Sequence, residues 1–230
     1  MPTKRLTVVT LIFILVCNYT FSQDWPGLNR YKAENGKLSA PAQGEKRVVF
    51  MGNSITDEWI KISPDFFKGK SYIDRGIGGQ TTPQMLVRFR ADVIKLQPKV
   101  VVILAGTNDI AGNTGPSTLE MIEDNLTSMT ELAKANHIKI ILCSVLPANK
   151  YPWKPEVKPA DSIIALNGWI KAYAAAKKFL YVDYYSSMVD EKKGLKTELS
   201  KDGVHPTIEG YKIMEGLVEE GIKKVLKQKK

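Results

Sequence analysis

The sequence of 230 residues is poor in two residue types that often carry chemistry, with only two cysteines and two histidines. Two cysteines are too few for a disulfide framework. Two histidines are too few for a zinc cluster unless carboxylates complete it, so the sequence implies no metal. A chain of this length buries enough apolar surface to fold without either device. Its 43% hydrophobic and 25% charged residues also exclude a disordered or fibrous protein.

Long apolar runs are scarce as well, and the one that stands out lies at the N-terminus. Leu6 to Val16 is nearly all apolar and lies between the basic pair Lys4-Arg5 and a short polar stretch. This order is typical of a secretory signal peptide over residues 1–23, with cleavage after residue 22 or 23. The run is well short of the ~20 residues that a membrane-spanning helix needs. We therefore expect residues 24–230 to be exported, to the periplasm or the medium, without stable membrane insertion after cleavage.

Cys17 leaves a second form of export open, because the cysteine of a lipoprotein signal carries the lipid. Here the bulky Val16 precedes it, where such signals usually have a small residue, so simple export is favoured over lipid anchoring. The exported chain then keeps a single cysteine, Cys143. It lies in an apolar run, where a small buried side chain is a better interpretation than a nucleophile.

Acidic residues are outnumbered, 24 against 33 Lys and Arg, which gives a formal charge of +9. Removal of Lys4 and Arg5 with the signal lowers this charge to +7. Five lysines lie among the last eight residues, where they complement the dipole of a terminal helix, and without them the charge is only about +2. No basic patch is interleaved with aromatic residues, so we expect no nucleic-acid partner.

Short apolar runs alternate with longer helical patterns, which favours a parallel sheet with crossover helices. The third and fourth runs are continuously apolar, as expected for strands that helices cover on both faces. The sequence thus predicts one three-layer α/β/α domain, with a five-stranded parallel sheet of flavodoxin-like order 2-1-3-4-5 and an N-terminal helical segment (24–45) packed on it. The predicted strands are 47–51, 71–73, 100–104, 138–145 and 179–182, and the predicted helices are 25–39, 81–96, 117–136, 161–177 and 207–227.

Four polar segments follow predicted strands, and ligands of an open parallel sheet bind beyond the carboxyl ends of its strands. We expect these segments to meet at one edge of the sheet. Together they contain a hydroxyl, glycine-rich backbone donors, a side-chain amide, and a carboxylate three residues before an imidazole. Those are the groups that acyl transfer by a serine nucleophile requires. The segments are Gly52 to Thr56, Arg75 to Thr82, Ala105 to Asp109, and Asp202 to Pro206.

Ser54 is the candidate nucleophile, and its position selects the base that must take its proton. His137 precedes the fourth strand, at the amino end of the sheet and roughly a strand length (~17–20 Å) away. His205 follows the last strand and shares the edge of Ser54, so it is the candidate base. Asp202 is spaced to accept a hydrogen bond from the His205 ring and to fix its tautomer.

The transition state of acyl transfer carries negative charge on the former carbonyl oxygen, so donors are needed there. The candidates are the backbone N–H of Ser54, the backbone N–H of Gly79, and the side-chain amide of Asn108. Each has a purely structural alternative, because glycines shape turns and asparagines cap them. The glycine run 76–79 lacks the last glycine of a dinucleotide fingerprint, which would fall at Thr81, so no nucleotide cofactor is implied.

Taken in order, Gly52-Asn53-Ser54, Gly79, Gly106-x-Asn108-Asp109 and Asp202-x-x-His205 resemble the four sequence blocks of the SGNH (GDSL-type) hydrolases. The resemblance covers roughly residues 46–227. It implies a serine esterase with Ser54 as nucleophile, His205 as base, Asp202 as the orienting carboxylate, and Ser54, Gly79 and Asn108 in the oxyanion hole. The sequence has Asn53 where the family has Asp, a side chain on which no catalytic assignment depends.

The stretch from Arg75 to Thr82 is similar to the platelet-activating-factor acetylhydrolase-like and carbohydrate-esterase branches of this family, whose members favour short acyl groups. This implies a small ester or an acylated glycan as substrate, with acetyl as the expected acyl group. Tyr151 and Trp153, in the loop after the fourth strand, are candidates for stacking on a sugar ring, with plain loop packing as the alternative.

Four other functions stay open. A lipid acylhydrolase or lysophospholipase and a thioesterase would use the same fold and the same serine. A glycan-binding module without catalysis would have no use for Ser54, Asp202 and His205 together. A cofactor binder of flavodoxin type is the most distant alternative.

Overall fold

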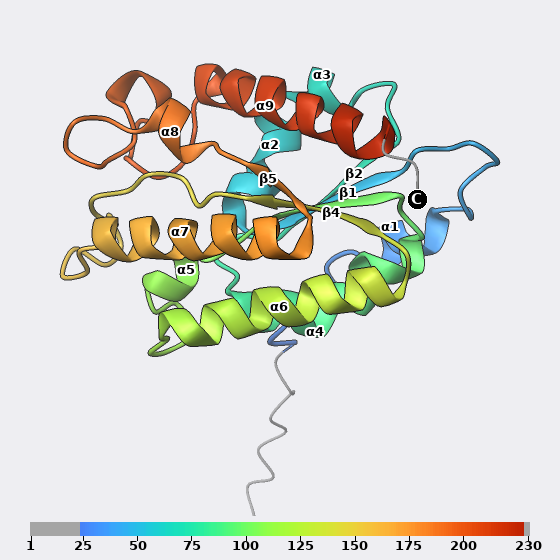
Figure 1. Cartoon of the computed structure of the whole chain (residues 1–230), viewed down its shortest axis with the longest axis horizontal. Helices are drawn as coiled ribbons and strands as arrows, with labels where there is room; N and C mark the ends of the chain where they lie inside the picture. Colours follow the sequence, from blue (N-terminus) through green and yellow to red (C-terminus); the bar gives the residue numbers. More distant parts are fainter. Residues whose placement is uncertain (1–23, 228–230) are drawn as a thin grey trace, which may run out of the picture.

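A computed structural model describes residues 24–227, and its centre is a parallel sheet with strand order β2-β1-β3-β4-β5 (Figure 1). All four strand pairings are parallel. This confirms the predicted order and the predicted α/β class, and the observed strands differ from the predicted ones only at their ends. The strands are β1 Val48–Gly52, β2 Tyr72–Gly76, β3 Val100–Leu104, β4 Lys139–Cys143 and β5 Leu180–Val182.

Helices cover both faces of the sheet, which completes the three layers (Figure 1). On one face, Val49, Val101 and Ile140 pack against the helices α4, α6 and α7. On the other face, Phe50 and Val102 pack against α2, α3 and α9. Neighbouring residues of a strand point to opposite faces, so each strand serves both cores. The helices are α2 Ser54–Ile62, α3 Pro64–Phe67, α4 Thr82–Asp92, α6 Leu119–Ala135, α7 Ala160–Lys177 and α9 Ile208–Lys227.

Four of the five predicted helices are present, and the segment 25–39 is the exception. It forms a helix only over α1, Lys32–Lys37. Before α1, the carboxylate of Asp24 accepts hydrogen bonds from the N–H groups of Leu28 and Asn29, and Gly27 has a φ of +70°. The side chain therefore takes donors that a helix would otherwise use, which favours turns. The prediction of a helix over the whole segment was wrong.

Several short elements complete the described chain. The helices α2 and α3, between β1 and β2, were not predicted, and neither were the one-turn elements. None of the helices in residues 24–227 is long and apolar enough to cross a bilayer. The predicted signal peptide and Cys17 lie outside the described residues. The one-turn elements are α5 Thr107–Ile110, α8 Tyr185–Met188, and the 3-10 helices η1 Ile94–Leu96 and η2 Thr197–Leu199.

Cys143 is buried at the end of β4, as the sequence predicts. Burial raises the pKa of its thiol to about 12. Since the thiolate is the reactive form, this cysteine is a core residue and is unsuited to nucleophilic chemistry.

Candidate active site

A hydrogen-bonded chain joins the three candidate catalytic side chains at the carboxyl edge of the sheet. Ser54 Oγ lies 2.9 Å from Nε2 of His205, and the other ring nitrogen, Nδ1, lies 2.7 Å from Oδ2 of Asp202. Ser54 begins α2 directly after β1, and the other two residues lie in the loop before α9. With a carboxylate on Nδ1, Nε2 is available to the hydroxyl as a base. The arrangement can therefore activate a serine nucleophile.

The loop that carries Asp202 and His205 is closed by its own hydrogen bonds. Oδ1 of Asp202 accepts hydrogen bonds from the backbone N–H of Val204 at 2.9 Å and of His205 at 2.8 Å. Partial burial raises the pKa of Asp202, but the His205 ring and these N–H groups outweigh burial and lower the pKa to about 2. The carboxylate is thus ionised at ordinary pH and can stabilise an imidazolium.

Ser200 belongs to this loop and was not identified from the sequence. Its backbone pairs with Pro206 in a β-bridge, and its Oγ accepts a hydrogen bond from the N–H of Gly203 at 2.9 Å. The same Oγ lies 3.1 Å from Oδ1 of Asp202 and 2.8 Å from the carbonyl oxygen of His205. A hydroxyl two residues before an aspartate is a usable signal, because serine side chains bond to nearby backbone in such turns.

The first turn of α2 leaves the backbone N–H of Ser54 available. Asn53 caps the helix, and its Oδ1 accepts the hydrogen bond from the N–H of Ile55 at 3.1 Å. The carbonyl of Asn53 accepts the N–H groups of Thr56 and Asp57. None of these bonds uses the N–H of Ser54. This N–H lies at the positive end of the helix dipole. Asparagine in place of the family's aspartate still supplies the capping oxygen.

The other two oxyanion candidates lie on neighbouring loops. Gly79 has a φ of +75°, which favours glycine, and it is exposed. The amide of Asn108 is 2% exposed and donates to the carbonyl of Gln80 at 3.0 Å. Asn108 follows Gly106, where an added Cβ would lie 2.7 Å from Leu166 Cδ2, so this turn also needs glycine. One N–H of the Asn108 amide thus holds the loop that contains Gly79.

Asp109 also holds this loop, through hydrogen bonds to Thr82. Its Oδ1 accepts hydrogen bonds from the N–H and the hydroxyl of Thr82, at 2.9 and 2.6 Å. Burial raises the pKa of Asp109, and the Thr82 donors partly offset this effect. Asp109 therefore has a positioning role and does not enter the hydrogen-bonded chain of Ser54.

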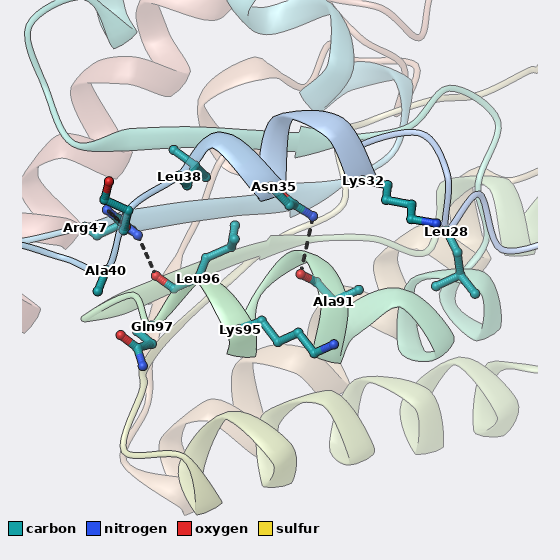
Figure 2. Close-up of a pocket in the computed structure, with 12 residues that line it drawn as sticks. Leu28, Lys32, Asn35, Leu38, Ala40, Arg47, Ala91, Lys95, Leu96 and Gln97 are labelled. Carbon is teal, nitrogen blue, oxygen red and sulfur yellow. Dashed lines mark hydrogen bonds between the residues drawn. The ribbon is translucent and has the colours of Figure 1, made fainter.

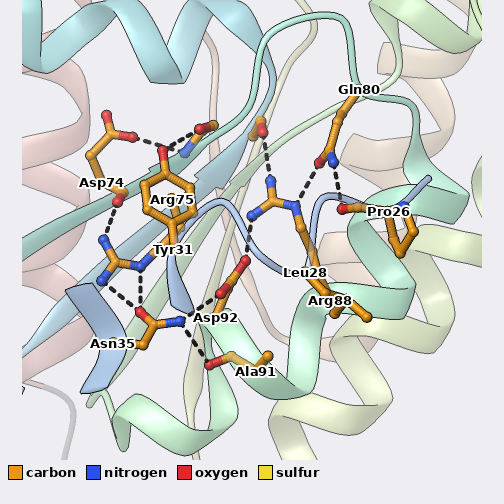
Figure 3. A network of polar contacts seen from close by, with 12 residues as sticks. Pro26, Leu28, Tyr31, Asn35, Asp74, Arg75, Gln80, Arg88, Ala91 and Asp92 are labelled. Carbon is orange, nitrogen blue, oxygen red and sulfur yellow. Dashed lines mark hydrogen bonds and ion pairs between the residues drawn. The ribbon is translucent and has the colours of Figure 1, made fainter. Parts of the chain in front are cut away.

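A buried arginine of α4 connects the nucleophile turn with the loop of Gly79 (Figure 3). Arg88 donates through Nη2 to the carbonyl of Gly52 at 3.0 Å and through Nε to the side chain of Gln80 at 2.5 Å. Its Nη1 donates to Asp92 at 3.1 Å. The guanidinium is fully buried, and these partners offset the cost of its desolvation. It holds the two segments in fixed relation.

The segment before β1 is attached to the same network (Figure 3). Gln80 donates to the carbonyl of Pro26 at 2.7 Å. Asn35 donates to Asp92 at 2.7 Å and accepts hydrogen bonds from Arg75. Residues 26–35 therefore contact the loops behind the candidate active site, and these contacts had no visible signal in the sequence.

The structure separates the two aromatic candidates. Tyr151 is 0% exposed, and its hydroxyl lies 2.8 Å from Oγ1 of Thr107. It stacks under Trp153, with the ring centroids 5.1 Å apart. A fully buried ring offers no face to a sugar, so the expectation that Tyr151 contacts substrate is corrected. Trp153 is 40% exposed and its ring lies 6.3 Å from that of His205, so it borders the site.

Asn113 connects Trp153 to the loop of Gly79. Its Oδ1 accepts a hydrogen bond from Nε1 of Trp153 at 3.0 Å, and its Nδ2 donates to the carbonyl of Gly79 at 3.2 Å. A single side chain thus fixes both the exposed tryptophan and the backbone of an oxyanion candidate. No pattern in the sequence points to Asn113.

The catalytic candidates lie at an open edge and not in the hollow that Figure 2 shows. That pocket, of about 410 Å³, lies between the segment 28–40 and the end of α4. Its wall includes Arg47, which donates to the carbonyl of Leu96 at 2.9 Å. None of the lining residues belongs to the hydrogen-bonded chain of Ser54. The side chain of His205 is 26% exposed, so the ring is accessible from the surface.

Comparisons with known proteins identify relatives of this chain. The model of the GDSL-like lipase/acylhydrolase family matches residues 50–213. A curated relative, the esterase TesA of Pseudomonas aeruginosa, is 26% identical over 170 residues, which cover 72% of this chain and 78% of TesA. The uncharacterised lipoprotein YqeF of Bacillus subtilis is 33% identical over 122 residues, 46% of this chain, and the match spans only half of that protein.

Solved structures share the fold. A Bacteroides fragilis protein provisionally named an acylhydrolase is 55% identical, covers 89% of this chain and 100% of its own, and superposes with a TM-score of 0.88. Axe2, an acetylxylan esterase from Geobacillus stearothermophilus, is 22% identical with a TM-score of 0.62, covering 81% of this chain and 96% of its own. At that identity the second likeness concerns the fold alone.

Proposed function

The chain belongs to the GDSL-like lipase/acylhydrolase family of ester hydrolases, and from this premise we propose that it is a serine esterase that removes short acyl groups, acetyl foremost, from a carbohydrate or glycoconjugate. The observation that carries the proposal is the hydrogen-bonded chain from Ser54 through His205 to Asp202. It supports the proposal because the imidazole contacts the hydroxyl and the carboxylate contacts the imidazole, as a base and its orienting group would. No cofactor is needed for this chemistry.

In the proposed reaction, Ser54 Oγ attacks the ester carbonyl and gives its proton to Nε2 of His205. The tetrahedral intermediate collapses, the sugar oxygen leaves with that proton, and the acyl group stays on Ser54. Water then attacks the acyl-serine with His205 again as the base, which releases the carboxylic acid and restores the hydroxyl. Asp202 remains ionised throughout and stabilises the imidazolium that forms twice.

The proposed oxyanion hole consists of the Ser54 N–H, the Gly79 N–H and the Asn108 amide. The support is their placement: a helix N-terminus, an exposed glycine in a left-handed conformation, and a buried amide that holds the Gly79 loop. Such donors stabilise charge that develops only in the transition state. Loss of one donor of this kind costs roughly 10²–10³-fold in kcat.

The open edge of the site is an argument for a polar, bulky substrate that carries a small acyl group. Trp153 stands beside His205 and can stack on a sugar ring, while the other candidate ring is buried beneath it. The alternative functions on the same site are those of a lipid acylhydrolase and a thioesterase.

Acetate release from a panel of acetylated glycans tests the proposal, with Ser54→Ala as the control. We expect release by the wild type and none above background by the variant. Equal background for both proteins on p-nitrophenyl acetate would contradict the esterase function itself. A preference for octanoyl over acetyl p-nitrophenyl esters would contradict the acetyl assignment and favour the lipid acylhydrolase.

We also propose that the protein is exported, on the pattern of residues 1–23, with lipid attachment at Cys17 as the alternative. Cell fractionation with N-terminal sequencing tests this. An N-terminus near residue 23 or 24 is expected, and an unprocessed protein that starts at Met1 would contradict it.

A further inference from the structure

Seven lysines line two adjoining grooves at the amino edge of the sheet, the edge opposite Ser54. The larger groove has a volume of about 840 Å³ and the smaller about 210 Å³, and the two share Ile138 and Lys139. Among the described residues that line them, the only acidic side chain is Glu45, which accepts a hydrogen bond from Nε of Arg47 at 2.8 Å. The lysines are Lys46, Lys95, Lys99, Lys134, Lys139, Lys177 and Lys178.

The sheet sets the order of these cations. The N–H of Lys99 donates to the carbonyl of Arg47 at 2.8 Å, and the N–H of Lys139 donates to the carbonyl of Lys99 at 3.0 Å. The starts of β1, β3 and β4 thus lie side by side, and Lys178 precedes β5. Neighbouring strands are ~4.8 Å apart, so the cationic residues follow one another in a row across the molecule.

Helix dipoles explain only part of this row. Lys134 and Lys177 lie in the last turns of α6 and α7, where they complement the negative ends of the helix dipoles. Lys46 and Lys99 precede strands and have no such role. Neither forms a salt bridge within residues 24–227. Like charges held close together repel one another, so an anionic partner would stabilise this edge.

We propose that these two grooves bind a linear anionic polysaccharide, with carboxylate groups repeated along the chain. A row of cations inside a groove complements an extended polymer with repeated charges. Lysines are mobile point charges that pair with carboxylates without a fixed geometry. The partly buried apolar residues Ile94 and Leu226 in the larger groove offer contacts to the C–H faces of sugar rings.

Two other anionic partners fit the grooves less well. Single-stranded nucleic acid binds through aromatic stacking platforms, and among the described lining residues only the half-buried Phe179 and the imidazole of His137 carry an aromatic ring. A flat membrane surface meets a concave strip at its rims only. The site is also separate from the reaction at Ser54, because the length of the strands lies between them. In Figure 1 this edge lies on the right, where α9 ends, and α5 marks the opposite end.

Affinity electrophoresis in gels that contain polygalacturonate tests the proposal, with neutral xylan gels as the reference. The test variant carries Lys46→Gln, Lys99→Gln and Lys134→Gln. The matched control carries Lys68→Gln, Lys171→Gln and Lys212→Gln, three exposed lysines outside the grooves. Both variants lose three positive charges, so a difference between them reports the position of the charges and not their number.

We expect the wild type and the control to be retarded by polygalacturonate but not by xylan, and the groove variant to bind at least about 10-fold more weakly. Equal weakening of both variants, or no retardation of the wild type, would overturn the proposal. Co-sedimentation with phosphatidylglycerol vesicles in the absence of polygalacturonate binding would also overturn it, in favour of a membrane partner. Hydrolysis of p-nitrophenyl acetate should be the same in all three proteins, which separates this test from that of the esterase function.

Discussion

Asn113 holds two parts of the candidate site with one side-chain amide, the ring of Trp153 and the carbonyl of Gly79. We predict that Asn113→Ala lowers kcat/KM on p-nitrophenyl acetate by about 5–10-fold, because two hydrogen bonds that position the proposed substrate-contacting groups are lost. The matched variant Trp153→Phe loses only the indole N–H and leaves the Asn113–Gly79 bond intact.

The two variants should differ in the kinetic parameter that changes. If the Gly79 bond aligns an oxyanion donor, Asn113→Ala lowers kcat, whereas Trp153→Phe mainly raises KM. Steady-state kinetics of both proteins measure this split. Identical effects of the two substitutions on kcat would show that the bond to Gly79 has no part in catalysis.

Asp74 lies buried at β2, and one of its oxygens, Oδ2, has no hydrogen-bond partner within the described residues. Burial, with a contribution from the charge of Asp57, raises its pKa to about 7, although the N–H of Gly76 and the charge of Arg75 act in the opposite direction. A folded-state pKa above the unfolded value means that the folded protein holds the proton more tightly. The free energy of unfolding should therefore fall as the pH rises from about 4 to about 7 and then level off.

We predict that Asp74→Asn removes this part of the pH dependence, since asparagine keeps an acceptor for Gly76 but does not ionise. Relative to wild type, the variant should gain on the order of a few kcal/mol between pH 4.5 and pH 8. Urea unfolding at both pH values measures the gain. Parallel stability curves for the two proteins would argue against an ionising Asp74.

The rarity of histidine and the edge rule for parallel sheets together led to His205, and Asp202 followed from its spacing. The sequence does not predict how side chains pack. Tyr151 and Trp153 are both aromatic residues of one loop, and only the three-dimensional stack between them shows which one is buried. Asn113 was out of reach for the same reason, because both of its partners are distant in the chain.

Among the elements, β3 and the long helices were predictable because each has a strong apolar pattern. The helix α2 was not, because it is short and starts at the functional turn itself. The segment 25–39 shows the opposite error, since an amphipathic pattern was present but the Asp24 carboxylate competed for the backbone donors. A local side-chain bond can override periodicity, because it offers backbone donors an alternative to the helix.

The contact of α4 with the end of β1 depends on Arg88. We predict that Arg88→Met destabilises the protein by about 3–5 kcal/mol, because it leaves the buried Asp92 without its ion-pair partner. The carbonyl of Gly52 and the side chain of Gln80 also lose their donor. Urea unfolding measures the loss. A double variant with Asp92→Asn should recover part of it, and no recovery would indicate that packing, not charge, determines the effect.

Across the whole molecule, the structure changes the meaning of the net charge. From the sequence, the excess of lysine looked like a signal peptide and a helical tail on an ordinary surface. The fold instead gathers lysines from the starts of several strands and the ends of several helices at one edge. No window of the sequence contains this row, because parallel topology brings together residues that are far apart in the chain.

This division of charge and chemistry between opposite edges predicts how salt affects the enzyme. On an acetylated acidic polysaccharide, the lysine-lined grooves should raise the local concentration of polymer near the enzyme, so that KM increases with ionic strength. The Debye length falls from about 10 Å at 0.1 M salt to about 3 Å at 1 M, which weakens such binding.

KM on p-nitrophenyl acetate should not change, because that ester needs only the Ser54 edge. The variant that carries Lys46→Gln, Lys99→Gln and Lys134→Gln should have a high KM on the polymer at every salt concentration, with kcat preserved. Acetate release measured across a salt series checks this, and equal salt dependence for the polymer and the small ester would show that the grooves play no part in substrate capture.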